Sequence, residues 1–193
     1  DGKWVAPTET KTYKVIDPSN EQPCAEISLG GKKDIDKAVS AAKKAFETWA
    51  FTKKEERLEL LEKLYVIYKK RWAEMAKLIS LEMGAPMKFS TEMQAATGAS
   101  HIKSFKNILK DFKFEKDLGD EKNNQKLLYE PKGVCALITP WNWPINQVNL
   151  KVIPALASGC TVVLKPSEVA PLSSMLLAEM IDEAKFPAGV FNL

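Results

Sequence analysis

Two short apolar runs in the last third of the chain each end at a cluster of polar residues. The first covers residues 133–139 and leads into Pro-Trp-Asn-Trp-Pro, and the second covers residues 160–165 and leads into Pro-Ser-Glu. Apolar runs of this length are typical of strands buried in a parallel sheet, whose carboxyl ends carry functional groups along one edge. Together with the helical patterns beside them, they give the order strand, helix, strand, helix, strand at residues 133–139, 145–157, 160–165, 172–184 and 189–193.

This order predicts an α/β fold that contains the first half of a doubly wound, Rossmann-like parallel sheet. A helical segment precedes the sheet, because apolar residues recur at helical spacing over residues 35–49, 54–83 and 86–112. Gly84 is placed to close the second of these helices as its C′ residue. The small residues at 95–100 predict that the third helix packs closely against a neighbour.

The remaining segments predict antiparallel β-structure. Residues 1–31 form an extended segment, with strands expected at 4–5, 13–16 and 25–28. Residues 113–130 predict a β-hairpin around a polar turn at 120–124, and its exposed edges need a partner. The expected segments are therefore 1–31 (extended), 32–112 (helical), 113–130 (hairpin) and 131–193 (parallel sheet).

The charge and cysteine content argue against several kinds of partner. The chain has 28 basic and 25 acidic residues without a block of like charge, which argues against a nucleic acid or a membrane surface. No apolar run approaches the roughly 18 residues of a membrane-spanning helix. The three cysteines are too few and too scattered for a disulfide framework or a zinc site, so we expect no metal and a reducing, cytoplasmic location.

Asn142 is a candidate functional residue because it lies between two tryptophans just beyond a strand end. Its side-chain amide could donate a hydrogen bond to a developing oxyanion. It could also be the N-cap of the next helix, in which Pro144 suits the first turn. The residue by itself leaves both roles open.

Lys165 and Glu168 form a second candidate group at the end of the other strand. A carboxylate at such an edge can accept hydrogen bonds from both hydroxyls of an adenosine ribose, and it repels a 2′-phosphate. The alternative is a surface lysine followed by the start of the next helix. No G-x-G-x-x-G sequence follows either strand, so the usual dinucleotide fingerprint is absent.

The other titratable residues give weaker signals. Lys151 has apolar neighbours in the helix at 145–157, so it is either a solvated lysine or a partly desolvated one near the strand ends. His101 is distant in sequence from these motifs, and a structural role is expected. Cys24, Cys135 and Cys160 have no basic partner in sequence, so none is expected to be a nucleophile.

Taken together, these residues resemble the aldehyde dehydrogenase superfamily over the whole chain. The motifs that carry the resemblance are Gly2-Lys3-Trp4-Val5, Asp17-Pro18-Ser19, Asp36-Lys37-Ala38-Val39, Ala41-Ala42, Glu56-Arg57, Glu82-Met83-Gly84-Ala85-Pro86, Pro140-Trp141-Asn142-Trp143-Pro144, Pro154-Ala155-Leu156-Ala157-Ser158-Gly159-Cys160 and Lys165-Pro166-Ser167-Glu168. The resemblance implies an NAD-binding domain, a catalytic domain, and an oligomerisation role for the hairpin at 113–130.

The resemblance also implies roles for particular residues. Asn142 corresponds to the amide that stabilises the oxyanion of a cysteine thiohemiacetal, and Lys151 to a lysine of the active-site proton network. Trp143 and Gln147 correspond to a wall of the aldehyde tunnel. The residues implied in NAD binding are Ile138, Thr139, Pro140, Trp141, Lys165, Ser167 and Glu168.

The chain departs from the family pattern at the groups that complete the reaction. It contains neither the Gly-Gln-Cys motif of the nucleophile nor the Glu-Leu-Gly-Gly motif of the general base, so the catalytic domain is absent. We therefore expect the amino-terminal portion of an NAD-dependent aldehyde dehydrogenase that continues past Leu193. The intact protein would oxidise an aldehyde to a carboxylic acid as a homo-oligomer (dimer or tetramer), whereas this portion alone would be inactive. The alternative is a naturally truncated, non-catalytic module for nucleotide binding or oligomerisation.

Overall fold

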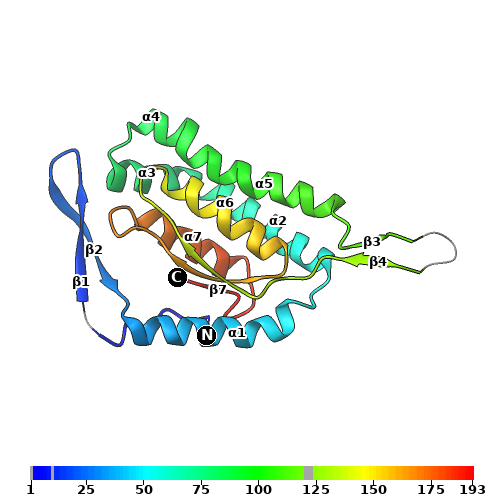
Figure 1. Ribbon diagram of the computed structural model, residues 1–193. Helices are drawn as coiled ribbons and strands as arrows, with labels where there is room; N and C mark the ends of the chain where they lie inside the picture. The colour runs from blue at the N-terminus through cyan, green and yellow to red at the C-terminus, as the bar shows by residue number, and fades with distance from the viewer. Residues whose placement is uncertain (1, 10, 120–123) are drawn as a thin grey trace.

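The computed structural model describes residues 2–9, 11–119 and 124–193. At its centre is a parallel sheet in the order β5–β6–β7, formed by β5 (Val134–Ile138), β6 (Thr161–Lys165) and β7 (Phe191–Asn192). The helices α6 (Pro144–Ala157) and α7 (Leu172–Glu183) connect these strands (Figure 1). The predicted α/β fold and the order of its sheet elements are therefore confirmed.

Helices cover both faces of the sheet. On one face lies α1 (Lys32–Trp49), where Trp49 Nε1 donates to the carbonyl of Cys160 at 3.1 Å and Thr161 Oγ1 donates to that of Ala42 at 3.0 Å. On the other face lie α6 and α7, and α2 (Lys54–Lys70), α3 (Trp72–Met83) and α5 (Ala95–Asp111) pack outside them (Figure 1). One cluster of buried apolar side chains extends from α1 to α7, so the sheet and the helices share a core.

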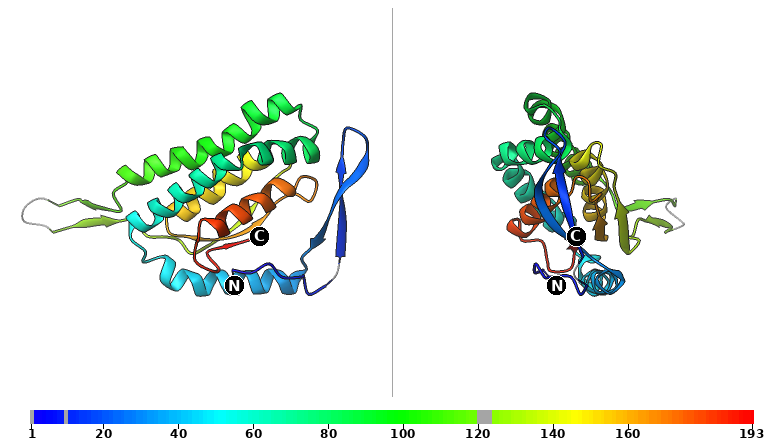
Figure 2. Two further views of the ribbon diagram at one scale, coloured as in Figure 1. Left: turned by 180° about the vertical axis from the view of Figure 1, so that it is seen from behind. Right: turned by 90° about the vertical axis from the view of Figure 1, so that its left-hand side faces the viewer.

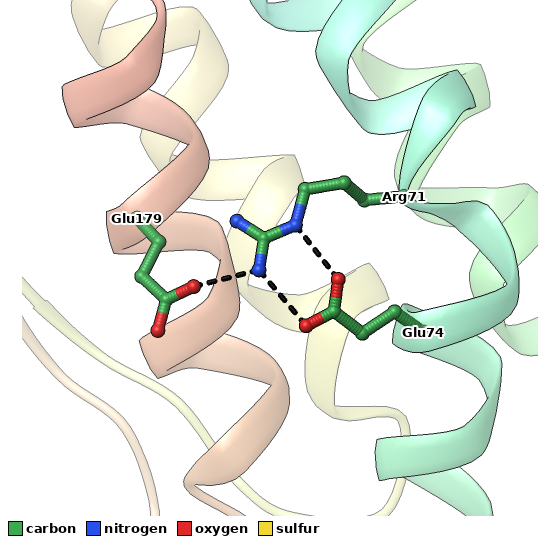
Figure 3. Close-up of polar contacts among 3 residues, drawn as sticks. All are labelled: Arg71, Glu74 and Glu179. Atoms are coloured by element: carbon green, nitrogen blue, oxygen red, sulfur yellow. Dashed lines mark hydrogen bonds and ion pairs between the residues drawn. The ribbon is translucent and has the colours of Figure 1, made fainter.

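The helical segment is more divided than its apolar spacing predicts. The prediction of a single helix at 54–83 is wrong, because α2 and α3 are separate helices that meet at Arg71. The backbone of Arg71, with φ of −96° and ψ of 16°, is not helical. The Arg71 guanidinium binds Glu74 of α3 and Glu179 of α7, and these contacts accompany the break (Figure 3). The predicted helix at 86–112 likewise consists of α4 (Met87–Phe89), the π-helical turn η1 (Ser90–Gln94) and α5.

Two glycines allow close approaches within this layer. Gly84 ends α3 with a φ of +76°, the left-handed conformation expected of a glycine cap. Gly98 lies where α5 meets α2 and α6, and a Cβ there would be 2.3 Å from the Tyr68 hydroxyl and 3.0 Å from the Ile145 side chain. The predicted close packing of residues 95–100 is confirmed.

The antiparallel segments project from opposite ends of the body (Figure 2). One is the ribbon of β1 (Lys11–Asp17) and β2 (Gln22–Leu29), and the other is the hairpin of β3 (Glu115–Asp117) and β4 (Lys126–Leu128). Except for Asn124, the predicted hairpin turn lies outside the described residues. In the described part of the chain, no helix has the length and apolar character needed to cross a membrane.

The predicted strand at residues 4–5 is wrong. Trp4 and Val5 are exposed, and this segment pairs with none of the strands in the described residues. The chain instead crosses the start of α1, where the Thr8 backbone N–H and hydroxyl both donate to Asp34 Oδ1, at 2.8 and 2.7 Å. The strands predicted at 13–16 and 25–28 are confirmed within β1 and β2.

Candidate functional site

The carboxyl ends of β5 and β6 meet at one edge of the sheet. Ile138 and Lys165 are register partners, and the Thr139 N–H donates to the Lys165 carbonyl at 3.3 Å. The two loops that follow these strands therefore start side by side. At this edge Ile138 and Trp141 are exposed, with 74% and 50% of their surfaces accessible, so the edge presents apolar as well as polar groups.

Lys165 and Glu168 form an ion pair in the second loop. Lys165 Nζ donates to Glu168 Oε2 at 2.7 Å, and this hydrogen bond lowers the pKa of the Glu168 carboxyl below its usual value. Ser167 stabilises the loop, because its hydroxyl accepts a hydrogen bond from the Val169 N–H at 3.3 Å. Both side chains of the ion pair are partly exposed, so the interaction between them is weak. Either group can therefore leave it to bind a ligand.

Asn142 lies in the first loop and does not cap α6. The N-cap position is Trp143, and Pro144 is the first helical residue, so the interpretation of Asn142 as an N-cap is wrong. The Trp143 ring is fixed by an edge-on contact with Phe89, with ring centroids 5.5 Å apart. Among the described residues the exposed Asn142 amide has no hydrogen-bond partner, and it therefore keeps its donors for a ligand.

Three of the predicted residues follow one another along α6. Trp143, Gln147 and Lys151 are separated by four residues each and therefore share one side of the helix. Lys151 Nζ lies 3.4 Å from Gln147 Oε1 and 3.5 Å from the Gln147 carbonyl. The lysine is half-buried, which agrees with the partly desolvated alternative.

His101 is closer to these residues than its sequence position indicates. α5 packs along α6, and His101 Nε2 is 2.8 Å from Asn146 Oδ1, next to Gln147. The cysteines stay away from this edge: Cys160 precedes β6 at the opposite end of the sheet, and burial raises the pKa of the Cys135 thiol to about 11. Neither is a candidate nucleophile here.

Glu82 belongs to the motif 82–86, but the sequence assigned it no role of its own. It lies on α3, only 2% of its surface is accessible, and it accepts backbone hydrogen bonds from Leu172 and Ser173 at the start of α7. Burial raises the pKa of its carboxyl to about 7. Its position three residues after the buried Ile79 was the available signal, because this spacing places an acid on the apolar side of α3.

Comparisons with known proteins show the family of this chain. The model of the aldehyde dehydrogenase family matches residues 4–193. A 3-succinoylsemialdehyde-pyridine dehydrogenase from a Pseudomonas species is 48% identical over 100% of this chain, which covers 40% of that relative. The chain thus spans about 40% of the length of the curated relatives it matches.

Solved structures give the same result. An aldehyde dehydrogenase from Bartonella henselae is 57% identical with a TM-score of 0.96, over 100% of this chain and 40% of its own. A mutant of aldehyde dehydrogenase C from Pseudomonas syringae, crystallised with NAD⁺ and octanal, is 42% identical with a TM-score of 0.96, over 100% of this chain and 39% of its own. This chain belongs to the aldehyde dehydrogenase family.

Proposed function

We propose that this chain is the cofactor-binding and oxyanion-binding portion of an NAD-dependent aldehyde dehydrogenase. The intact protein would oxidise an aldehyde to a carboxylic acid. The observation that carries the proposal is the register of β5 and β6, which brings the Asn142 loop and the Lys165–Glu168 pair to one sheet edge. Relatives that share this fold have been crystallised with NAD⁺, one of them also with an aldehyde.

The groups at this edge fit the adenosine half of NAD⁺. Glu168 has a lowered pKa, so it is ionised at neutral pH and can accept hydrogen bonds from both ribose hydroxyls, with Lys165 beside it as a donor. The exposed Ile138 and Trp141 offer apolar surface to the cofactor. The Thr139-Pro140 backbone and Ser167 would complete the part of the cofactor site at this sheet edge. Bound NAD⁺ would supply the hydride acceptor of the reaction.

The side of α6 next to Asn142 fits the aldehyde. The Asn142 amide, which the helix does not use, would donate to the oxygen on which negative charge develops. Trp143 and Gln147 would form part of the wall around the substrate. Lys151 is half-buried and contacts the Gln147 side chain, and it would take part in the proton network of the active site.

The hairpin of β3 and β4 would join copies of the intact protein into a dimer or tetramer. Its strands are short and fully exposed, and Leu118, Leu128 and Tyr129 are 63%, 57% and 40% accessible. Exposed strand edges and apolar side chains of this kind require a partner.

The experiment that tests the function follows NADH absorbance with a panel of aldehydes. It uses the 193-residue chain and the longest polypeptide that is in frame with it. We expect activity in the longer polypeptide only, because no cysteine of the described residues lies at the site. Absence of NAD⁺-dependent oxidation in the longer polypeptide would contradict the proposal, and activity of the short chain would contradict the division of roles.

A further inference from the structure

The helix α7 begins without a capping side chain of its own. Its N-cap residue is Pro171, which makes no side-chain cap, so the first backbone N–H groups of the helix need acceptors from elsewhere. The start of α7 is also buried, because Ala170 is 1% accessible and Pro171 and Ser173 are buried as well. Water is therefore a poor substitute for a protein acceptor at this position.

Glu82 of α3 supplies these acceptors from 90 residues earlier in the chain. Glu82 Oε2 accepts from the Leu172 N–H, and Oε1 accepts from the Ser173 N–H at 3.1 Å. The carboxylate thus performs the role of an N-cap and lies at the end of the helix where the macrodipole favours negative charge. It attaches the start of α7 to a different helix.

This attachment lies next to the proposed ribose site. The connection from β6 to α7 covers residues 166–171 and contains Glu168. At one end the connection is held by the β5–β6 register at Lys165, and at the other end by Glu82. The Glu168 carboxylate therefore lies on a short stretch between these two anchors, where it is also paired with Lys165.

We propose that Glu82 is a positioning residue for the adenosine ribose of the cofactor, and that it acts by fixing the α7 end of the loop that carries Glu168. The inference rests on the proposed NAD⁺ binding at this edge. It assigns Glu82 no contact with the cofactor. The carboxylate holds two backbone N–H groups, and the loop carries the effect to Glu168.

Glu179 provides a matched control on the same helix. It joins the middle of α7 to the α2–α3 junction through Arg71, at 2.7 Å (Figure 3). Glu82→Gln and Glu179→Gln therefore make the same chemical change in two contacts between α7 and the α2–α3 segment. Only the first contact adjoins the loop of Glu168.

The experiment measures dissociation constants for NAD⁺, AMP and nicotinamide mononucleotide at pH 8, in the longest polypeptide that contains this chain. Glutamine has one acceptor and one donor group where two N–H donors must be satisfied. We expect Glu82→Gln to weaken NAD⁺ and AMP binding about tenfold, as for one lost charged hydrogen bond. Nicotinamide mononucleotide, which lacks the adenosine ribose, should change less than about twofold, and Glu179→Gln should leave all three constants within about twofold.

Amide hydrogen exchange gives a readout that does not depend on the cofactor. In Glu82→Gln the Leu172 and Ser173 amides should exchange faster, whereas the amides of β6 should be unchanged. If this variant does not fold, the same comparison uses Glu82→Asp, which keeps the charge but is one methylene shorter.

Three outcomes would overturn the inference. The first is unchanged NAD⁺ and AMP binding in Glu82→Gln, and the second is an equal loss for nicotinamide mononucleotide, which would indicate general destabilisation. The third is a failure of the unsubstituted protein to bind NAD⁺, which would refute the proposed function and the positioning role with it. Normal NAD⁺ binding without an effect of Glu82 would refute the positioning role alone.

Discussion

Glu168 forms an ion pair with Lys165, which lowers the pKa of its carboxyl below the usual value. An ionised carboxylate accepts from ribose hydroxyls but repels a phosphate. In Glu168→Gln we expect the KM for NAD⁺ to rise about tenfold and the preference for NAD⁺ over NADP⁺ to shrink, because the repulsion is lost. Steady-state kinetics with both cofactors measures this, with Asp182→Asn on the exposed side of α7 as the control. An unchanged cofactor preference would contradict the ribose role.

For Asn142, the structure decides against one of the two roles that the sequence allows. The sequence leaves an N-cap and an oxyanion donor open, and the N-cap position proves to be Trp143. In Asn142→Ala we therefore expect kcat of the intact enzyme to fall about 10²–10³-fold, as for the loss of one oxyanion donor. The free energy of unfolding should stay within about 0.5 kcal/mol, whereas loss of a cap costs about 1 kcal/mol. Urea denaturation and activity of the same sample distinguish the two roles.

Glu82 makes the stability of the chain depend on pH. Burial raises the pKa of its carboxyl in the folded state to about 7, from an ordinary value of 4.5. Folding therefore favours the protonated carboxyl. The stability that this proton contributes is complete below pH 4.5 and is lost as the pH rises through 7. Between these limits the free energy of unfolding should fall by about 3 kcal/mol relative to Glu82→Gln, at 1.36 kcal/mol per pKa unit. Urea denaturation of both proteins from pH 5 to pH 8 checks this, and parallel pH profiles would contradict it.

Among helices and strands, local pattern predicts the elements and tertiary contacts set their ends. The parallel strands were predictable because a run such as 162–164 is apolar throughout, as burial on both faces requires. The break at Arg71 was not, because the apolar spacing continues across it and the partner Glu179 lies 108 residues away. The cap of α7 could not be predicted for the same reason, since Glu82 lies 90 residues before the helix that it caps. Trp4 and Val5 are residue types common in strands, but among the described residues they pair with no strand.

The Arg71 contacts make a testable link between two elements. Arg71 donates two hydrogen bonds to Glu74 at 2.7 and 2.8 Å, and a third to Glu179 at 2.7 Å (Figure 3). Because the glutamates are about half exposed, we expect Arg71→Ala to lower the free energy of unfolding by only about 1 kcal/mol. A double-mutant cycle with Glu179→Gln should give a coupling of about 0.5 kcal/mol that decreases at high salt. A coupling of zero at low salt would show that Arg71 acts through packing alone.

At the scale of the whole molecule, the candidate site is the edge of the parallel sheet where the carboxyl ends of β5 and β6 meet. The sequence placed its candidate residues on two strand ends and one helix, and the structure brings the two strand ends together because a parallel sheet collects carboxyl ends at one edge. It did not place His101 beside Asn146, since that contact depends on how α5 packs on α6. The chain spans about 40% of the length of its curated relatives.

The hairpin of β3 and β4 concerns the association of whole molecules. The hairpin projects from the body (Figure 2), and Leu118, Leu128 and Tyr129 are exposed and lie outside the shared core. A charge placed there should therefore disturb association and leave folding intact. We expect Leu128→Lys to shift the intact protein toward monomers in analytical ultracentrifugation, with an unchanged circular dichroism spectrum. Ile108→Lys on α5 is the matched control, because Ile108 is 56% accessible and Leu128 57%. Ile108→Lys should retain the oligomer, whereas equal dissociation of both variants would show that association does not depend on the hairpin.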